Sequence, residues 1–145
     1  MFWFGVDPGE RRIGIAKSDA LGILASPLTI CDSQAALVST LQPFLDAGEV
    51  SGIVVGLPYN MSGSIGPIGQ RSLQFVAHLR SQLSVPIYLW DERLTSQQAA
   101  QSGAARAAGK RGGAIDDKAA AVLLQSYLDA GTPQVSDPEG PVDGV

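Results

Sequence analysis

Short apolar runs alternate with turn signals along the first third of the chain, a pattern typical of a β-meander. Residues Phe2–Asp7 form an aromatic and β-branched run that ends in an acid, and Pro8-Gly9 starts a turn directly after it. Residues Ile13–Asp19 alternate apolar with small or polar positions, and Gly22–Cys31 form a third run. Because the connecting turns are short, we predict three antiparallel strands, with Pro27 marking an edge strand or a bulge.

Helical patterns begin after this meander. Asp32-Ser33 can cap a helix that runs to about Ala47, and residues 51–58 read as a buried strand. Pro67 suits the first turn of a second helix. This helix would place five apolar residues on one face, namely Ile68, Phe75, Val76, Leu79 and Leu83.

The last third continues the alternation of strand and helix. Residues 85–90 form an apolar strand, and Thr95 with Gln98 predicts a capping box for a helix that ends near Ala108. Asp116-Asp117 open a final helix that ends near Asp129. The predicted order is β-β-β-α-β-α-β-α-α, which gives an α/β fold with a mixed five-stranded sheet and helices on both faces. Right-handed crossovers would set the fourth and fifth strands parallel to the first.

Composition sets the broad class of the protein. The 145 residues are 45% hydrophobic, which suits one domain, predicted over residues 1–131, followed by a flexible acidic tail over 132–145. No apolar run is long enough to span a bilayer, and the N-terminus lacks a signal peptide pattern. The single Cys31 excludes an internal disulfide and a cysteine-rich zinc site. We therefore expect a cytoplasmic protein without a membrane partner.

The net charge of −4 argues against a strongly basic nucleic-acid binder. Much of this charge lies in the tail, which holds three acids and no base. Without residues 132–145, ten basic residues face eleven acidic ones, a net charge of −1. A local basic patch on the domain is compatible with that balance.

Acids close two of the predicted strands. Asp7 ends the first strand and Asp91-Glu92 ends the fifth, and ligands bind at the carboxyl ends of parallel strands. Asp116 would join them if the last helix packs back over the first strand. Clustered carboxylates repel one another, so such a group indicates a hard divalent cation.

Each acid also has a purely structural explanation. Asp7 before Pro-Gly suits a turn residue, and Asp116 suits a helix N-cap. Glu92 and Asp91 both suit a solvated strand end, and this explanation fits Asp91 better than Glu92. Arg93 can either pair with a neighbouring acid or hold a phosphate.

Four motifs in fixed order carry a family resemblance: GVDPGERRIGIAKSD, IVVGLPYNMSGSIGP, WDERLTS and IDDKAAAVLLQSYLD. Over residues 2–130 the chain resembles the YqgF family of Holliday-junction-resolvase-like proteins. This resemblance implies the ribonuclease-H-like fold and similarity to the RuvC resolvases, which cut branched DNA with divalent metal. It also implies a role in maturing the 5′ end of 16S ribosomal RNA.

The resemblance also implies the site residues. Asp7, Glu92 and Asp116 match the family's catalytic acids and would hold Mg²⁺ or Mn²⁺, with Asp117 as the alternative third ligand. The basic loop before the last helix is shorter here than in relatives. Nucleic acid would then be bound by six basic residues: Arg11, Arg12, Arg71, Arg93, Lys110 and Arg111.

The implied function is a metal-dependent nuclease that processes the 5′ end of pre-16S rRNA, with ribosomal precursor particles as partners. One alternative is a resolvase of Holliday-junction DNA. A second is a non-catalytic nucleic-acid- or nucleotide-binding module, because GVDPG also resembles the phosphate loop of actin-like and sugar-kinase ATPases. Both a monomer and a homodimer are compatible with the sequence.

Overall fold

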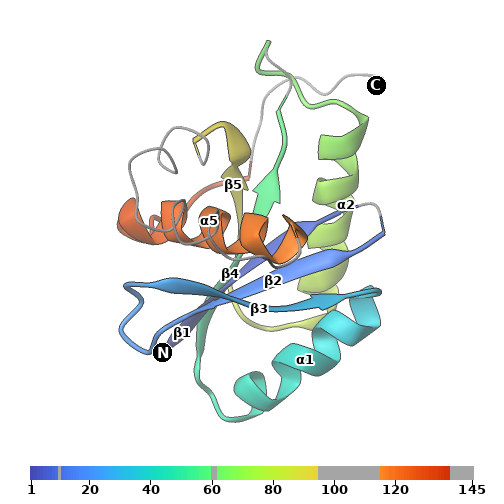
Figure 1. The fold of residues 1–145 in the computed structure, drawn as a ribbon. Helices are drawn as coiled ribbons and strands as arrows, with labels where there is room; N and C mark the ends of the chain where they lie inside the picture. Colours follow the sequence, from blue (N-terminus) through green and yellow to red (C-terminus); the bar gives the residue numbers. More distant parts are fainter. Residues whose placement is uncertain (10, 60–61, 95–114, 138–145) are drawn as a thin grey trace.

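A five-stranded sheet forms the centre of the computed structural model, which describes residues 1–9, 11–59, 62–94 and 115–137 (Figure 1). The strands are β1 (Phe2–Pro8), β2 (Ile13–Ser18), β3 (Ala25–Cys31), β4 (Val50–Leu57) and β5 (Ile87–Asp91). The longer helices among the described residues are α1 (Gln34–Asp46), α2 (Pro67–Gln82) and α5 (Ile115–Asp129). Among the described residues, no helix is both long enough and apolar enough to cross a membrane.

The strands lie in the order β3-β2-β1-β4-β5. β1 and β3 are antiparallel to β2, whereas β4 is parallel to both β1 and β5. This confirms the predicted meander and the predicted parallel set. Because Val6 pairs with Val55 and Leu57 pairs with Asp91, the carboxyl ends of the three parallel strands meet at one edge of the sheet.

Pro27 explains the shape of the outer strand. β3 is the edge of the sheet next to β2, and the register between them shifts where Ile15 and Ala16 face Thr29 and Pro27. Proline has no backbone N–H, so it fits at an edge or an irregularity of a sheet. The structure therefore confirms both parts of the prediction.

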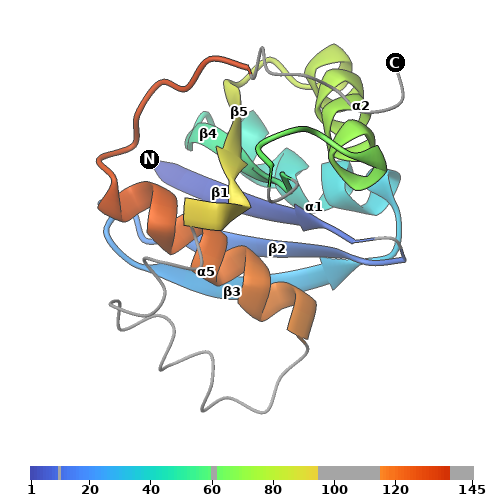
Figure 2. The ribbon, with the colours of Figure 1, turned by 90° about the horizontal axis from the view of Figure 1, so that it is seen from above.

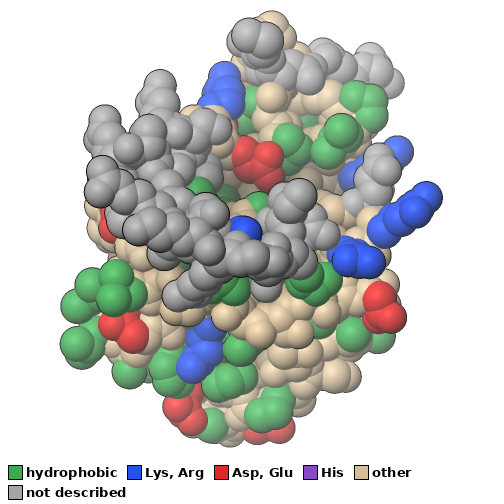
Figure 3. Space-filling model, viewed as in Figure 1, with side chains coloured by type: hydrophobic (Ala, Val, Ile, Leu, Met, Phe, Trp, Pro, Cys, Tyr) green, Lys and Arg blue, Asp and Glu red, His purple; other side chains and the backbone are tan. Residues whose placement is uncertain are grey.

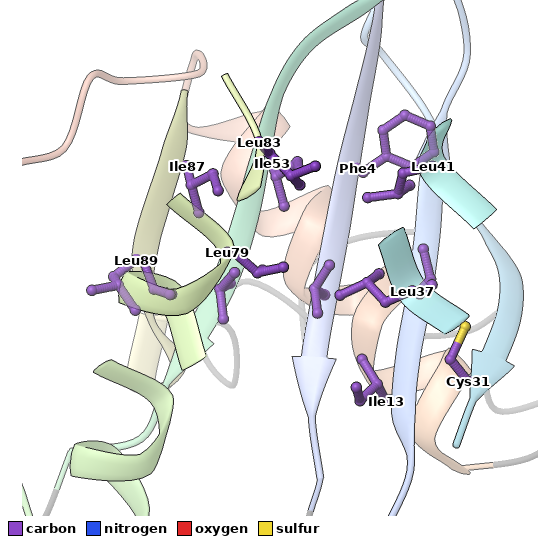
Figure 4. Close-up of a cluster of buried hydrophobic side chains, with 14 of the residues drawn as sticks. Phe4, Ile13, Cys31, Leu37, Leu41, Ile53, Leu79, Leu83, Ile87 and Leu89 are labelled. Atoms are coloured by element: carbon purple, nitrogen blue, oxygen red, sulfur yellow. The ribbon is translucent and has the colours of Figure 1, made fainter. Parts of the chain in front are cut away.

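The two faces of the sheet are covered by different helices (Figure 2). α1 and α2 lie on one side, where residues such as Phe4, Leu37 and Leu79 form the larger apolar core (Figure 4). α5 covers the opposite side and packs across β1, β2 and β3. Its Tyr127 is fully buried, with its ring centroid 5.1 Å from that of Trp3.

The first two helices, α1 and α2, begin where the sequence predicts. Ser33 is the N-cap of α1, and its Oγ accepts a hydrogen bond of 3.1 Å from the backbone N–H of Ala36. Pro67 occupies the first turn of α2. Cys31 is buried, as expected for a small core residue.

The predicted buried face of α2 was wrong at Ile68, which is 58% exposed. At Gly69 the helix packs closely against the segment after β4, because an added Cβ would lie only 2.8 Å from the carbonyl oxygen of Pro58. The buried face is therefore centred on Gly69, Ser72 and Val76, and Ile68 lies on the flank of the helix.

The helix predicted after β5 lies only partly within the described residues. Residues 92–94 are already helical directly after β5, three residues before the predicted start at Thr95. The Thr95–Gln98 capping box and the helix to Ala108 lie outside the described residues.

The first part of the predicted tail contacts the domain. Asp137 accepts two hydrogen bonds from the Arg80 guanidinium, of 2.7 and 2.9 Å, and this partner lowers the pKa of Asp137. The hydroxyl of Tyr127 donates a hydrogen bond of 2.6 Å to the carbonyl of Pro133, and Val135 packs against the core under α5. Residues 132–137 therefore lie against the domain.

Candidate active site

Asp7 and Glu92 lie on the same face of the sheet, at the edge where β1 and β5 end. Successive side chains of a strand point to opposite faces. Phe4 and Val6 belong to the core under α1 and α2, so Asp7 faces the α5 side. Glu92 follows the last residue of β5, and the Asp7 charge acts on it directly.

Gly56 makes room for the Glu92 side chain between the two strands. Gly56 pairs with Trp90 of β5, and its preceding residue, Val55, pairs with Val6 of β1. A Cβ added at Gly56 would lie 2.6 Å from Glu92 Oε1. The carboxylate therefore lies across β4 toward β1, in space that any larger residue at position 56 would occupy.

Burial and like charge raise the pKa of Glu92. Desolvation is the largest cause, and the charges of Asp7 and Asp91 add to it. A site that destabilises its own carboxylate in this way is stabilised by a bound cation, and carboxylate oxygens are the ligands that Mg²⁺ and Mn²⁺ prefer. The pair Asp7–Glu92 thus has the donor chemistry of a divalent metal site.

The path of α5 brings its first turn toward Asp7. Trp3 of β1 contacts Tyr127 near the end of the helix, whereas a Cβ on Gly5 would lie 2.9 Å from the carbonyl of Ala120. The helix therefore runs antiparallel to β1. One further helical turn before Ala120 covers about 5.4 Å, close to the two-residue step from Gly5 to Asp7.

Asp116 and Asp117 belong to that first turn, because α5 begins at Ile115. Their side chains lie outside the described part of the chain, so the assignment of the third ligand stays a prediction. Among the described residues, no group of three or more His, Cys, Asp or Glu is placed to hold a metal ion. The described portion supplies two converging acids, Asp7 and Glu92.

Asp91 has a partner of its own, Arg93. Its carboxylate binds the Arg93 guanidinium through contacts of 2.8 to 3.1 Å and also accepts the Arg93 backbone N–H at 2.9 Å. Arg93 in turn stacks on the Tyr59 ring at 4.6 Å from its centroid. The Arg93 side chain is 49% exposed, and its Nε and Nη2 are the nitrogens that donate to the Asp91 carboxylate.

Three other predicted basic residues, Arg11, Arg12 and Arg71, lie beside the same edge. Arg11 and Arg12 are exposed in the β1–β2 turn, and Arg71 is exposed on α2. Figure 3 shows Lys and Arg side chains gathered on this side of the molecule. Lys110 and Arg111 lie outside the described residues. Arg11, Arg12, Arg71 and Arg93 thus form a local basic region on a chain that is acidic overall.

Two contributions to the site were missed at the level of sequence. Gly56 sits within the apolar run IVVGLP, where a glycine inside a strand can mark a close approach of another group. Tyr59, which supports Arg93, follows the same strand after Pro58 and has no distinguishing sequence pattern.

A family comparison gives this geometry its context. The family model RuvX, described as Holliday junction resolvase, matches residues 1–130. The chain belongs to the RuvX family. This confirms the resemblance drawn from the four motifs, and it places the protein among nucleases, which hydrolyse phosphodiester bonds.

Curated relatives of this RuvX-family chain carry the name "Putative pre-16S rRNA nuclease". The relative from Thermoanaerobacter pseudethanolicus is 41% identical over 131 residues, which cover 87% of this chain and 94% of the relative. The relative from Geobacillus kaustophilus is 42% identical over 132 residues, which cover 87% and 96%. The similarity thus extends over almost the whole length of each relative.

Solved structures confirm the ribonuclease-H-like fold. T. thermophilus RuvC in complex with Holliday junction substrate superposes with a TM-score of 0.63, covering 92% of this chain and 97% of RuvC. The fowlpox virus resolvase in complex with Holliday junction DNA superposes with a TM-score of 0.51, covering 92% of this chain and 100% of the resolvase. Sequence identities of 15% and 12% restrict the inference from these two structures to the fold.

Proposed function

We propose that this RuvX-family protein is a divalent-metal-dependent nuclease that processes the 5′ end of pre-16S rRNA. The observation that carries the proposal is the convergence of Asp7 and Glu92 at the carboxyl edge of the sheet, with the pKa of Glu92 raised there. The name of the curated relatives supports the choice of pre-16S rRNA as substrate. Ribosomal precursor particles in the cytoplasm are the proposed setting.

Asp7 and Glu92 would hold Mg²⁺ or Mn²⁺, and Asp116 would complete the set, with Asp117 as the alternative. When bound, the metal supplies the positive charge that activates an attacking water and stabilises the leaving oxygen of the phosphodiester. Gly56 leaves the Glu92 carboxylate room to face Asp7. The direction of α5 supports Asp116, because its first turn approaches the end of β1.

The arginines would position the nucleic-acid backbone. A guanidinium binds phosphate through two parallel hydrogen bonds. Arg93 is pre-oriented for this role by Asp91 on one side and by the Tyr59 ring on the other. Arg11, Arg12 and Arg71 would extend the contact along the strand away from the cut, with Lys110 and Arg111 as further candidates.

Cleavage of branched DNA is the second candidate function. The family description and the RuvC structure with a Holliday junction favour it. The metal site would be the same, so the substrate alone separates the two candidates. We favour RNA because the more similar relatives, at about 40% identity, carry the rRNA name.

The test compares two substrates with one set of variants. The protein is incubated with a pre-16S RNA fragment or a four-way DNA junction, with Mg²⁺ or Mn²⁺ and with a chelator. We expect metal-dependent cleavage at the 5′ end of the RNA, lost in Asp7→Asn and Glu92→Gln. Asp46→Asn, an exposed carboxylate on α1 remote from the site, is the matched control and keeps its activity. Full cleavage by both site variants would disprove the metal site, and cleavage of the junction alone would favour the second candidate.

A further inference from the structure

A pocket of about 430 Å³ lies between the end of β1 and α2, next to the proposed metal site. Its lining consists of Pro8, Gly9, Ile68, Arg71, Ser72 and Phe75. The four α2 residues follow the spacing of one helical face, and the other wall is the start of the β1–β2 turn. The volume falls within the range of about 300–1,000 Å³ that small-ligand pockets have.

The pocket walls are mostly apolar and include the aromatic ring of Phe75, on which a flat apolar group can stack. Pro8, Ile68 and Phe75 supply apolar surface, and Ile68 is 58% exposed although nothing in the core requires it there. Ser72 is buried, and its hydroxyl donates a hydrogen bond of 3.4 Å to the carbonyl of Ile68. The Ser72 hydroxyl is thus already hydrogen-bonded to the backbone of α2.

The rim of the pocket suits a negative charge. Arg71 is an exposed residue on the α2 wall, and Arg11 and Arg12 are exposed in the turn that continues from Gly9. The Gly9 N–H donates a hydrogen bond of 2.9 Å to the carbonyl of Arg12, which joins the two ends of this turn. A flat apolar group with an anion beside it is the chemistry of a nucleotide, whose base stacks while its phosphate meets arginine.

The pocket lies next to the proposed metal site along the chain, since its lining residue Pro8 directly follows Asp7. Pro8 is the next residue after Asp7, and the two side chains face opposite sides of β1. A nucleic-acid strand whose phosphate lies at Asp7 and Glu92 would pass over the C-terminal end of β1 to reach the face of the sheet that α2 covers. A base can enter the pocket there only when it is unpaired and unstacked.

We propose that this pocket binds an unpaired nucleobase adjacent to the cleaved phosphodiester, so that the protein cuts at single-stranded or extruded nucleotides and not inside continuous duplex. The inference rests on the proposed nuclease function and defines its substrate more closely. It applies equally to an unpaired rRNA leader and to an unpaired position at a DNA branch, because the pocket reads the base and not the sugar.

The test measures binding separately from cleavage. Oligonucleotides carry an abasic site at successive positions around the cleavage point, and their affinity is measured with Glu92→Gln protein and Mg²⁺. Loss of one stacked base weakens binding by about 5- to 100-fold. We expect this loss at one flanking position, and we expect Ile68→Glu to reduce the affinity for the intact strand by a similar factor.

The decisive measurement is whether the effect of removing the base depends on the Ile68→Glu substitution. In Ile68→Glu protein, removal of the same base should cost less than twofold, since the pocket no longer accepts it. Leu24→Glu, at a residue 63% exposed on the β2–β3 turn, is the matched control and should retain the full abasic effect. Equal abasic losses in Ile68→Glu and Leu24→Glu protein would overturn the pocket assignment.

The experiments test the nuclease function and the base-binding pocket independently of each other. Unmodified protein that cleaves but shows no coupling at Ile68 remains a nuclease and contradicts the pocket. Protein that shows the coupling but does not cleave contradicts the nuclease function and supports a base-binding module. Thermal melting of the Ile68→Glu variant verifies folding, and the exposure of Ile68 predicts a native transition.

Discussion

The carboxylate of Glu92 lies over Gly56, so closely that a methyl group at position 56 would lie 2.6 Å from Oε1. The glycine on β4 therefore determines where the acid after β5 can reach. The contact joins a residue of β4 to the acid that follows the adjacent parallel strand β5. In this position the Glu92 carboxylate interacts electrostatically with Asp7.

Replacement of Gly56 by Ala should displace Glu92 and abolish most metal-dependent cleavage. The stability cost should be modest, about 1 kcal/mol, at the low end for overpacking, because the Glu92 side chain can move. Cleavage rate and thermal melting measure the two effects. The cost should shrink in a Glu92→Ala background, where the clashing side chain is absent; an unchanged cost there would contradict the contact.

Glu92→Gln should raise the stability of the metal-free protein at neutral pH. The folded-state pKa of Glu92 is raised, so protonation favours the folded protein and ionisation of Glu92 costs stability as pH rises through the unfolded and then the folded pKa. The difference in melting temperature between Glu92→Gln and the unmodified protein should therefore vanish below about pH 4.5. Added Mg²⁺ should stabilise the unmodified protein more than the variant.

The third ligand can be identified by comparing Asp116→Asn with Asp117→Asn. Both residues lie in the first turn of α5, where Asn loses only the favourable interaction of a carboxylate with the helix dipole, about 0.3–1 kcal/mol, so neither change should lower the melting temperature by more than a few degrees. We expect Asp116→Asn to lose metal-dependent cleavage and Asp117→Asn to keep it. The reverse result would assign the ligand to Asp117, and full activity in both would remove the α5 carboxylates from the site.

Tyr127→Phe should destabilise the protein by about 1 kcal/mol, the typical contribution of one hydrogen bond. The Tyr127 hydroxyl donates to the carbonyl of Pro133, and this bond holds the segment after α5 against the domain. Burial raises the pKa of Tyr127 to about 12, with a smaller effect from Tyr88. Ultraviolet titration should therefore lose its most alkaline phenol step in Tyr127→Phe and retain that step in Tyr88→Phe.

Local sequence patterns predicted most of the elements because their causes are local. Ser33 caps α1, Pro67 starts α2, and Pro27 marks the irregular edge strand, each through the conformation or hydrogen bonding of its own backbone. The error at Ile68 had a non-local cause, because Gly69 brings α2 close to the Pro58 carbonyl and thereby selects its buried face.

The sequence by itself determined the order of the described strands and helices, the family and the acids at the ends of β1 and β5, because motif order and local propensity depend on neighbouring residues only. Only the tertiary structure decided which of these acids face each other and which are paired with a base. Strand pairing brings Gly56 next to Trp90 and sets Glu92 facing Asp7, whereas the pairing with Arg93 engages Asp91. Such contacts join residues up to 85 positions apart, from Asp7 to Glu92, and depend on the register of the sheet, which no single segment specifies.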